Sequence, residues 1–216
     1  MVDLVFVGKS VELDRHAMAP TLLLRVCVAN MTPRIKVENI LLQCQIRIEA
    51  TRRHYAPEEF EPLVELFGEA HRWSETVRSM LWIHTSAQVP AFDNEQYVDL
   101  PVPCSFDFNV AATKYFYGLE GGDVPLTLLF SGTIFYRDSE GFLQMEQISW
   151  SKQAAYQLPV RMWRELMDHY YPNSSWLRLD REVFDQIYQY KRQNGFTSWD
   201  DALRALLRLQ RKESCS

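Results

Sequence analysis

Apolar side chains at every second position recur along most of the first 150 residues, and this period of two constrains the fold more than any other feature of the sequence. The cleanest case is residues 40–49, where the apolar positions are Ile40, Leu42, Cys44, Ile46 and Ile48. Alternation puts successive side chains on opposite faces of a strand, so that one face is buried and the other is solvated. The sequence therefore predicts a protein built chiefly from antiparallel strands.

The same alternation, or a short run rich in apolar residues, predicts further strands. They are expected at residues 4–13, 21–30, 81–89, 98–110, 125–136 and 142–150. The last two are joined by Arg137-Asp138-Ser139-Glu140-Gly141 and are expected to form a hairpin. Gly8-Lys9-Ser10 resembles the end of a phosphate-binding loop, but Asp3 stands where that loop needs its first glycine, which favours a strand bulge.

Residues 98–110 contain two prolines and a cysteine that is a candidate nucleophile or metal ligand. Cys104 lies on the apolar, even-numbered side of this segment, as do Phe106 and Phe108. Pro101 and Pro103 lie on the other side and lack a backbone N–H, which indicates an edge, a bulge or a rim. Because a buried thiol has a raised pKa and little reactivity, we interpret Cys104 as a core residue.

Other parts of the sequence change to the helical period of 3.6. Between Pro57 and Gly68 apolar residues recur at i, i+3, i+4 and i+7, which predicts a short helix. A short helix or bend is expected at 111–123, and after Trp150 the chain is expected to be helical, at 159–172, 180–195 and from Ser198 onward. The expected buried faces are Val160, Trp163, Met167 and Tyr170 in the first of these last three helices and Val183, Phe184, Ile187 and Tyr188 in the second.

The order of these elements predicts an α+β protein that is mainly an antiparallel β-sandwich of the immunoglobulin-like (Ig-like) type, with about seven strands. Residues 1–152 would form the β-sandwich with a helical insertion near residues 57–80. Residues 153–216 would form a C-terminal helical extension packed on it.

The composition excludes several classes of function. The 216 residues are 47% hydrophobic and 24% charged, which is typical of a globular protein and not of a disordered one. A formal charge of −5 argues against a general nucleic-acid partner. The sequence has no run of about 18 apolar residues, and its first residues lack the pattern of a secretion signal, so we expect a soluble cytoplasmic protein without a membrane partner.

Motifs of common catalytic and metal-binding chemistry are missing from the sequence. It contains no G-x-S-x-G, H-E-x-x-H or EF-hand pattern, and therefore no catalytic residue is predicted. The four cysteines form no C-x-x-C pair, and neither a metal nor a cofactor is expected. The histidines lie far apart in the sequence, although a fold could still gather some of them; they are His16, His54, His71, His84 and His169.

Two groups of residues are candidates for binding. Arg52-Arg53-His54-Tyr55 follows a predicted strand and could contact an anion or a carboxylate, but a solvated face or an ion pair with Glu58 or Glu59 is the favoured interpretation. The second group is aromatic and lies near the predicted helical junction; it contains Trp163, Tyr170, Tyr171 and Trp176. Most of the aromatic residues there are expected to hold helices on the sheet, and any that are exposed would mark an interface.

A resemblance to a known family extends from about Pro20 to Ala202. It is carried by LLQCQIRIEATRRHY, VDLPVPCSFDFNVAATKYFY, VPLTLLFSGTIFY, LPVRMWRELMDHYYPNSSWLRL and YKRQNGFTSW. These runs resemble a bacterial family known only as a domain of unknown function, whose genes are often found in nickel-iron hydrogenase gene clusters. The resemblance implies a cytoplasmic accessory role in hydrogenase production or assembly, and it implies no catalytic or binding residue.

We therefore expect a non-enzymatic interaction protein, such as an assembly factor or chaperone-like partner of a hydrogenase subunit or maturation factor. It would use a sandwich face or the aromatic helices, and exposed sheet edges would allow a homodimer. The alternative is a small-molecule or metal-handling protein, enzymes included, with a pocket made from residues such as Arg53, His54, His84, Cys104 and His169. Convergence of such side chains would favour the alternative, whereas a shallow aromatic surface would favour the interaction protein.

Overall fold

The chain forms two compact units, residues 1–173 and residues 174–216. The computed structural model describes residues 2–33, 35–105, 110–174 and 177–213. Helix α4 (Val160–Tyr170) belongs to the first unit, and it ends just before Pro172 and Asn173. Asn173 has a left-handed backbone with φ 56°, a conformation that asparagine tolerates better than most residues.

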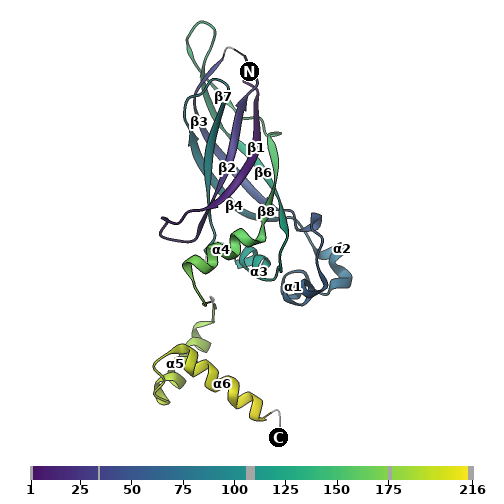
Figure 1. Cartoon of the computed structure of the whole chain (residues 1–216), viewed down its shortest axis with the longest axis vertical. Coiled ribbons are helices and arrows are strands. Elements are labelled where there is room, and N and C mark those ends of the chain that lie inside the picture. Colours follow the sequence, from purple (N-terminus) through teal and green to yellow (C-terminus); the bar gives the residue numbers. More distant parts are fainter. Residues whose placement is uncertain (1, 34, 106–109, 175–176, 214–216) are drawn as a thin grey trace. The chain divides into compact units, whose positions relative to one another are not determined.

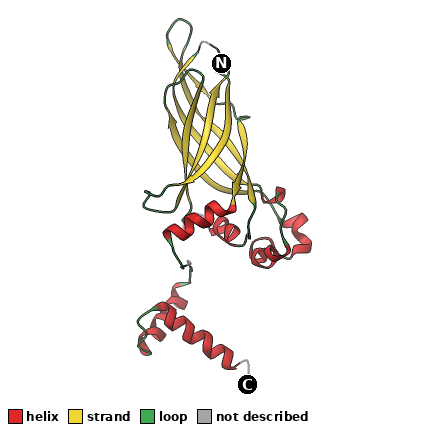
Figure 2. Ribbon diagram, viewed as in Figure 1, coloured by secondary structure: helices red, strands yellow, loops and turns green. Residues whose placement is uncertain are grey.

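The described part of the first unit contains eight strands, with short helices after β3, β5 and β8 (Figures 1 and 2). The strands are β1 (Leu4–Leu13), β2 (Thr21–Asn30), β3 (Lys36–Ile48), β4 (Met80–Val89), β5 (Glu95–Pro103), β6 (Asp123–Arg137), β7 (Leu143–Gln147) and β8 (Gln153–Pro159). The α-helices, besides α4, are α1 (Phe60–Phe67), α2 (Trp73–Thr76) and α3 (Val110–Tyr117), and the 3-10 helices are η1 (Ala50–Arg52), η2 (Pro57–Glu59) and η3 (Ala70–Arg72).

The strands form two antiparallel sheets. The three-stranded sheet has the order β1-β2-β5, and the five-stranded sheet has the order β4-β3-β6-β7, with β8 also paired to β6. Strand β6 pairs with β3 from Leu126 to Arg137, so β7 and β8 share its other side, β7 at residues 133–137 and β8 at residues 123–129. This part of the prediction is confirmed: the protein mixes α and β structure, and its sheets are antiparallel.

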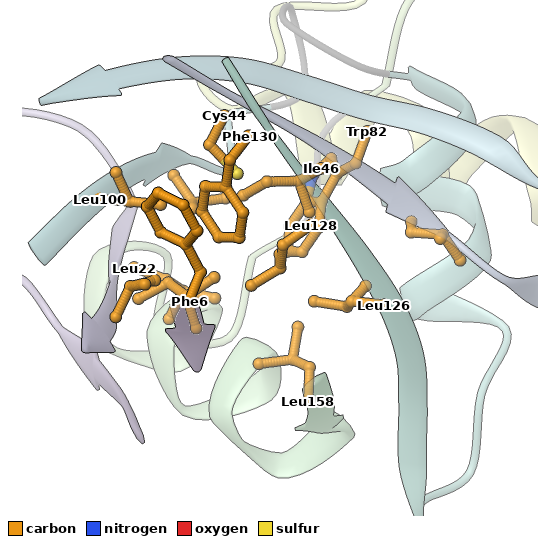
Figure 3. Packing of buried hydrophobic residues seen from close by; sticks show 14 of the residues in the cluster. Phe6, Leu22, Cys44, Ile46, Trp82, Leu100, Leu126, Leu128, Phe130 and Leu158 are labelled. Atoms are coloured by element: carbon orange, nitrogen blue, oxygen red, sulfur yellow. The ribbon is translucent and has the colours of Figure 1, made fainter. Parts of the chain in front are cut away.

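The apolar faces of the two sheets enclose one core. Phe6 of β1 stacks on Phe130 of β6 with ring centroids 4.2 Å apart, so the sheets face each other directly (Figure 3). Even-numbered residues of β2 and β3, such as Val26 and Ile46, are fully buried, as the period of two predicts. The helices α1 to α4 gather at one end of the sheets (Figure 1). There Trp163 of α4 stacks on Phe116 of α3 with centroids 5.6 Å apart.

The edges of the two sheets approach each other at Gly8 and at Thr85. A Cβ on Gly8 would lie 2.8 Å from the ring of Tyr156 in β8, so only glycine fits there. The register of β1 against β2 shifts between Gly8 and Ser10, which confirms the predicted bulge. Thr85 of β4 donates a hydrogen bond of 2.7 Å to the carbonyl of Pro101 in β5.

The segment 98–110 is only partly a strand. Strand β5 ends at Pro103, and Val110 begins α3, so the prediction of one strand through Val110 is wrong. Phe106 and Phe108 lie outside the described residues. The prediction of an edge is confirmed, because among the described strands β5 pairs with β2 alone. Cys104 is 4% exposed, which confirms that it is a core residue.

The expectation that the chain becomes helical after Trp150 is also wrong. Residues 153–159 form β8, which brings the described strands to eight. Its inward side chains include Tyr156 and Leu158, and Leu158 is fully buried. The sequence pattern missed this strand because the segment carries few large apolar residues. A short strand of this kind forms because it pairs with β6, more than because of its own sequence.

The second unit is a pair of helices, α5 (Arg181–Gln193) and α6 (Trp199–Glu213). Gly195, with φ 68°, lies in the turn between them. Ser198, the predicted start of α6, caps this helix: its hydroxyl accepts a hydrogen bond of 3.1 Å from the Asp201 backbone N–H and donates one of 2.6 Å to the Asp201 carboxylate. Within this unit the two helices do not bury the apolar face predicted for α5, because Val183, Phe184 and Tyr188 are each 43% exposed.

Candidate functional site

Arg53 of the predicted Arg52–Tyr55 patch forms a buried ion pair. Its guanidinium donates two hydrogen bonds to the Glu59 carboxylate, of 2.7 and 2.8 Å, and the two side chains are 7% and 2% exposed. It also donates to the carbonyls of Gly121, just before β6, and of Asp123, the first residue of β6. This is one of the two ion pairs that the sequence suggested, and it occupies the donors an external anion would need.

The Glu59 carboxylate is equally well bonded. Besides Arg53, it accepts hydrogen bonds from the backbone N–H of Ala56 (3.0 Å) and of Glu120 (2.8 Å). Burial raises the pKa of Glu59, but these hydrogen bonds outweigh burial and hold its pKa below the usual value. The pair therefore stays charged and joins the start of α1 to the segment that precedes β6.

Tyr55 completes this network. The guanidinium of Arg53 lies 5.0 Å from the centre of the Tyr55 ring, and the Tyr55 hydroxyl donates to the Ala50 carbonyl at 2.8 Å. The Tyr115 hydroxyl, 3.0 Å away, can then donate to the Tyr55 oxygen. Burial raises the pKa of both tyrosines, so neither is poised to ionise near neutral pH. Arg52 and His54 are exposed, and an anion contact there stays a prediction.

The predicted aromatic group separates into residues with different environments. Trp163 is 5% exposed and packs in the core. The Tyr170 hydroxyl lies 2.8 Å from the Asp14 carbonyl and 2.7 Å from the Ala17 carbonyl, and so ties α4 to the loop after β1. Tyr171 is half-buried against Tyr170, and Trp176 lies outside the described residues. Trp163 and Tyr170 thus hold α4 in place, as expected of most of this group.

The residues of the predicted pocket are not brought together. Cys104 is buried, and burial raises the pKa of its thiol to about 12. Of the five side chains, His84 alone lines one of two surface clefts found in the described part of the chain. Within the described residues no group of three or more His, Cys, Asp or Glu side chains could hold a metal ion, and no helix is long and apolar enough to cross a membrane.

An aromatic face on α5 and α6 is the surface that sequence reasoning missed. The ring of Trp199 lies 5.2 Å from that of Phe184 and 6.0 Å from that of Tyr188, and Trp199 is 39% exposed. Lys191 and Arg192 lie over the rings of Trp199 and Tyr188 at 5.6 and 5.9 Å. The period of 3.6 predicted the apolar face of α5 but placed it in a core. The small size of the second unit is the signal that could have predicted its exposure.

Comparison with known proteins places the chain in a family. The model of the "Family of unknown function (DUF6084)" matches residues 1–215. The chain belongs to this family. No curated protein has a sequence similar to that of this DUF6084 member. The family description itself gives no activity and no site residue.

Solved structures have only a distant likeness to this DUF6084 chain. Beta-glucosidase 3B from Thermotoga neapolitana, in complex with alpha-D-glucose, is 11% identical over 72% of the chain with a TM-score of 0.27, and the match spans 17% of the glucosidase. A candidate ApaA protein from Bordetella pertussis is 13% identical over 73% of the chain and 93% of its own length, with a TM-score of 0.23. At TM-scores below 0.5 neither likeness indicates a fold or a function.

Proposed function

We propose that the protein is a non-enzymatic interaction protein whose aromatic face on α5 and α6 binds a protein partner. The observation that supports this proposal most directly is the exposure of Phe184, Tyr188 and Trp199 on one small unit. Aromatic side chains of this kind contribute much of the binding energy at interfaces. The first unit, which we propose to be an Ig-like β-sandwich, would be the scaffold.

The small size of the second unit supports an interface on it. Residues 174–216 are 43 residues long, near the length below which a chain rarely encloses a core without a partner. Among its described side chains Ala202 alone is buried. Leu207 and Leu209 are 59% and 52% exposed and extend the apolar surface along α6. Covering this surface removes apolar area from water, which is the main driving force of association.

Charge indicates the chemistry of the partner. The sequence of residues 174–216 has eight Lys and Arg and six Asp and Glu, a formal charge of +2, whereas the whole chain has a charge of −5. The two cations beside the aromatic face, Lys191 and Arg192, would meet carboxylates of an acidic surface. From the family resemblance we propose that this surface belongs to a nickel-iron hydrogenase subunit or to one of its maturation factors, in the cytoplasm.

Copurification from the native host tests this proposal. The tagged full chain is compared with the double variant Phe184→Asp, Leu207→Asp, and recovered proteins are identified by mass spectrometry. The matched control is Met18→Asp, which places the same charge at a fully exposed apolar residue of the first unit. We expect a hydrogenase subunit or maturation factor with the wild type and the control, and its loss from the double variant.

Three results would contradict the proposal. The protein could be recovered alone, or it could retain the same partners in the double variant. Light scattering could also show that the wild type forms a dimer and the double variant does not, while no hydrogenase protein is recovered with either. In that last case a second copy of the chain, and not the hydrogenase machinery, covers the aromatic face.

A further inference from the structure

A shallow cleft lies on the outer face of the five-stranded sheet, away from the core. Its volume is about 580 Å³, which is within the usual range of small-molecule sites. Two rows of side chains cross its floor from β4 through β3 to β6. One row is Ser86, Gln43 and Ser131, and the next is His84, Gln45 and Leu129.

The polar side chains on this floor have free hydrogen-bonding groups. Within the described residues, none of Gln43, Gln45, His84, Ser86 and Ser131 has a side-chain hydrogen bond to another residue. Each glutamine amide offers two donor hydrogens and an acceptor oxygen, and each serine hydroxyl is both donor and acceptor. The ten residues that line the cleft in the described structure include no Asp, Glu, Lys or Arg. The floor is therefore free of carboxylate, ammonium and guanidinium groups and able to make many hydrogen bonds.

An exposed tryptophan borders the same cleft. Trp150 is 91% exposed and lies in a tight turn, in which the Lys152 N–H bonds to the Ser149 carbonyl at 3.0 Å. This turn interrupts the pairing of β7 and β8 with β6, opposite Gly132. A Cβ on Gly132, which has φ 132°, would lie 2.0 Å from the Leu41 carbonyl oxygen, so the backbone there requires glycine.

These features match one class of ligand. An indole face packs well against the C–H groups of a sugar ring, and amide and hydroxyl groups satisfy sugar hydroxyls. We propose that the cleft binds a neutral oligosaccharide, with Trp150 against a pyranose ring and Gln43, Gln45 and Ser131 bonded to its hydroxyls. A charged ligand would find no Asp, Glu, Lys or Arg among the ten residues of the cleft in the described structure.

A peptide fits the same surface less well. Peptides that bind a sheet usually add a strand at an open edge, where backbone N–H and C=O groups are unpaired. The floor of the cleft is centred on β3, whose backbone is paired with β4 on one side and β6 on the other. A peptide there would lose its backbone hydration without gaining a ladder of hydrogen bonds.

Nuclear magnetic resonance of the full ¹⁵N-labelled chain tests the proposal, with maltotriose, cellotriose and xylotriose as probes at millimolar concentration. We expect at least one probe to shift the Trp150 indole N–H and the side-chain amides of Gln43 and Gln45. Trp150→Ala should raise Kd about tenfold or more. It should also leave the rest of the spectrum unchanged, because Trp150 is exposed in a turn.

The matched control is Tyr117→Ala, which removes an exposed aromatic side chain at the end of α3 and should leave Kd unchanged. The proposal is overturned if none of the three probes shifts the Trp150 indole, or if Trp150→Ala binds as tightly as the wild type. It is also overturned if an uncharged Gly-Ser-Gln peptide shifts these signals and none of the sugars does.

Discussion

Helices α4 and α5 have similar sequence patterns, yet their apolar faces have different environments. Helix α4 buries Val160, Trp163 and Leu166, whereas α5 leaves Val183, Phe184 and Tyr188 each 43% exposed. Helix α4 follows β8 directly, and the Val160 N–H bonds to the Gly122 carbonyl at 2.9 Å, which fixes the start of the helix. Helix α5 belongs to the second unit, where Ala202 alone of the described side chains is buried. A period of 3.6 thus predicts a helix and its apolar face, but not what that face contacts.

The largest effect on the first unit is expected from breaking its buried ion pair. Glu59→Ala leaves the Arg53 guanidinium buried without a carboxylate and should lower the free energy of unfolding by about 4 kcal/mol. The double variant Arg53→Met, Glu59→Leu should recover most of that loss, because it removes both buried charges. Urea unfolding followed by circular dichroism measures this, with Glu58→Ala, at an exposed neighbour, as the control. Equal losses for Glu58→Ala and Glu59→Ala would contradict the role of the pair.

The comparison of α4 with α5 is tested directly by Trp163→Ala. Removing this buried ring leaves a cavity beside Phe116 and should lower the free energy of unfolding by about 3 kcal/mol. The same urea titration provides the measurement. A loss below about 0.5 kcal/mol, the level of an ordinary surface substitution, would mean that α4 does not depend on its packing.

Acid should weaken the first unit through Glu59. Its pKa is lower in the folded state than in the unfolded state, so the unfolded state binds more protons as the solution becomes acidic. The stability from Glu59 is therefore complete above the ordinary pKa of a glutamate and is lost as pH falls through that value and then through the lowered one. Across this acidic range, the free energy of unfolding should depend less steeply on pH in Glu59→Gln than in the wild type. If the free energy of unfolding depends on pH with the same slope in both proteins, Glu59 is not the group responsible.

A smaller effect is expected at Cys104. Cys104→Ala should cost about 1 kcal/mol of stability, because it removes one buried sulfur. The thiols of Cys104 and Cys44 both have a pKa raised to about 12 by burial, so a thiol reagent should label them only as fast as the chain opens. Mass spectrometry of the labelled protein measures this. Rapid labelling of folded protein at Cys104 would show a reactive group instead.

The smallest effect is expected on α5. Phe184→Ala should change the free energy of unfolding by less than about 0.5 kcal/mol, since Phe184 is 43% exposed and lies outside the core. Urea unfolding of the isolated full chain checks this. A loss as large as that of Trp163→Ala would show that the aromatic face is part of a core, and would remove the contrast between the two helices.

Sequence patterns predicted most strands of the fold, and two of them with the observed bounds. Strands β1 and β2 begin and end where the alternation does, at Leu4–Leu13 and Thr21–Asn30. The strand β8 could not be predicted, because its place is fixed by pairing with residues 123–129. The end of β5 was missed because alternation continues past Pro103 after the strand itself has ended.

The candidate sites were less predictable, because they depend on residues that are distant in sequence. Glu58 and Glu59 could be predicted as alternative partners of Arg53, but the carbonyls of Gly121 and Asp123 come from about 70 residues further along. Alternation correctly put Gln43 and Gln45 on the face opposite the core. Their alignment with His84 and Ser131 depends on strand register, which no single strand determines.

The pairing order of the three-stranded sheet has a consequence for synthesis of the chain. Strand β2 pairs with β5, about 70 residues later, and Phe6 of β1 stacks on Phe130 of β6. When the ribosome has made only β1 and β2, their apolar face therefore has no cover, and it remains without one until residues 95–137 emerge. A nascent chain stalled before Asp123 exposes that face, so it should aggregate or require a chaperone, whereas a chain released after Pro159 should not.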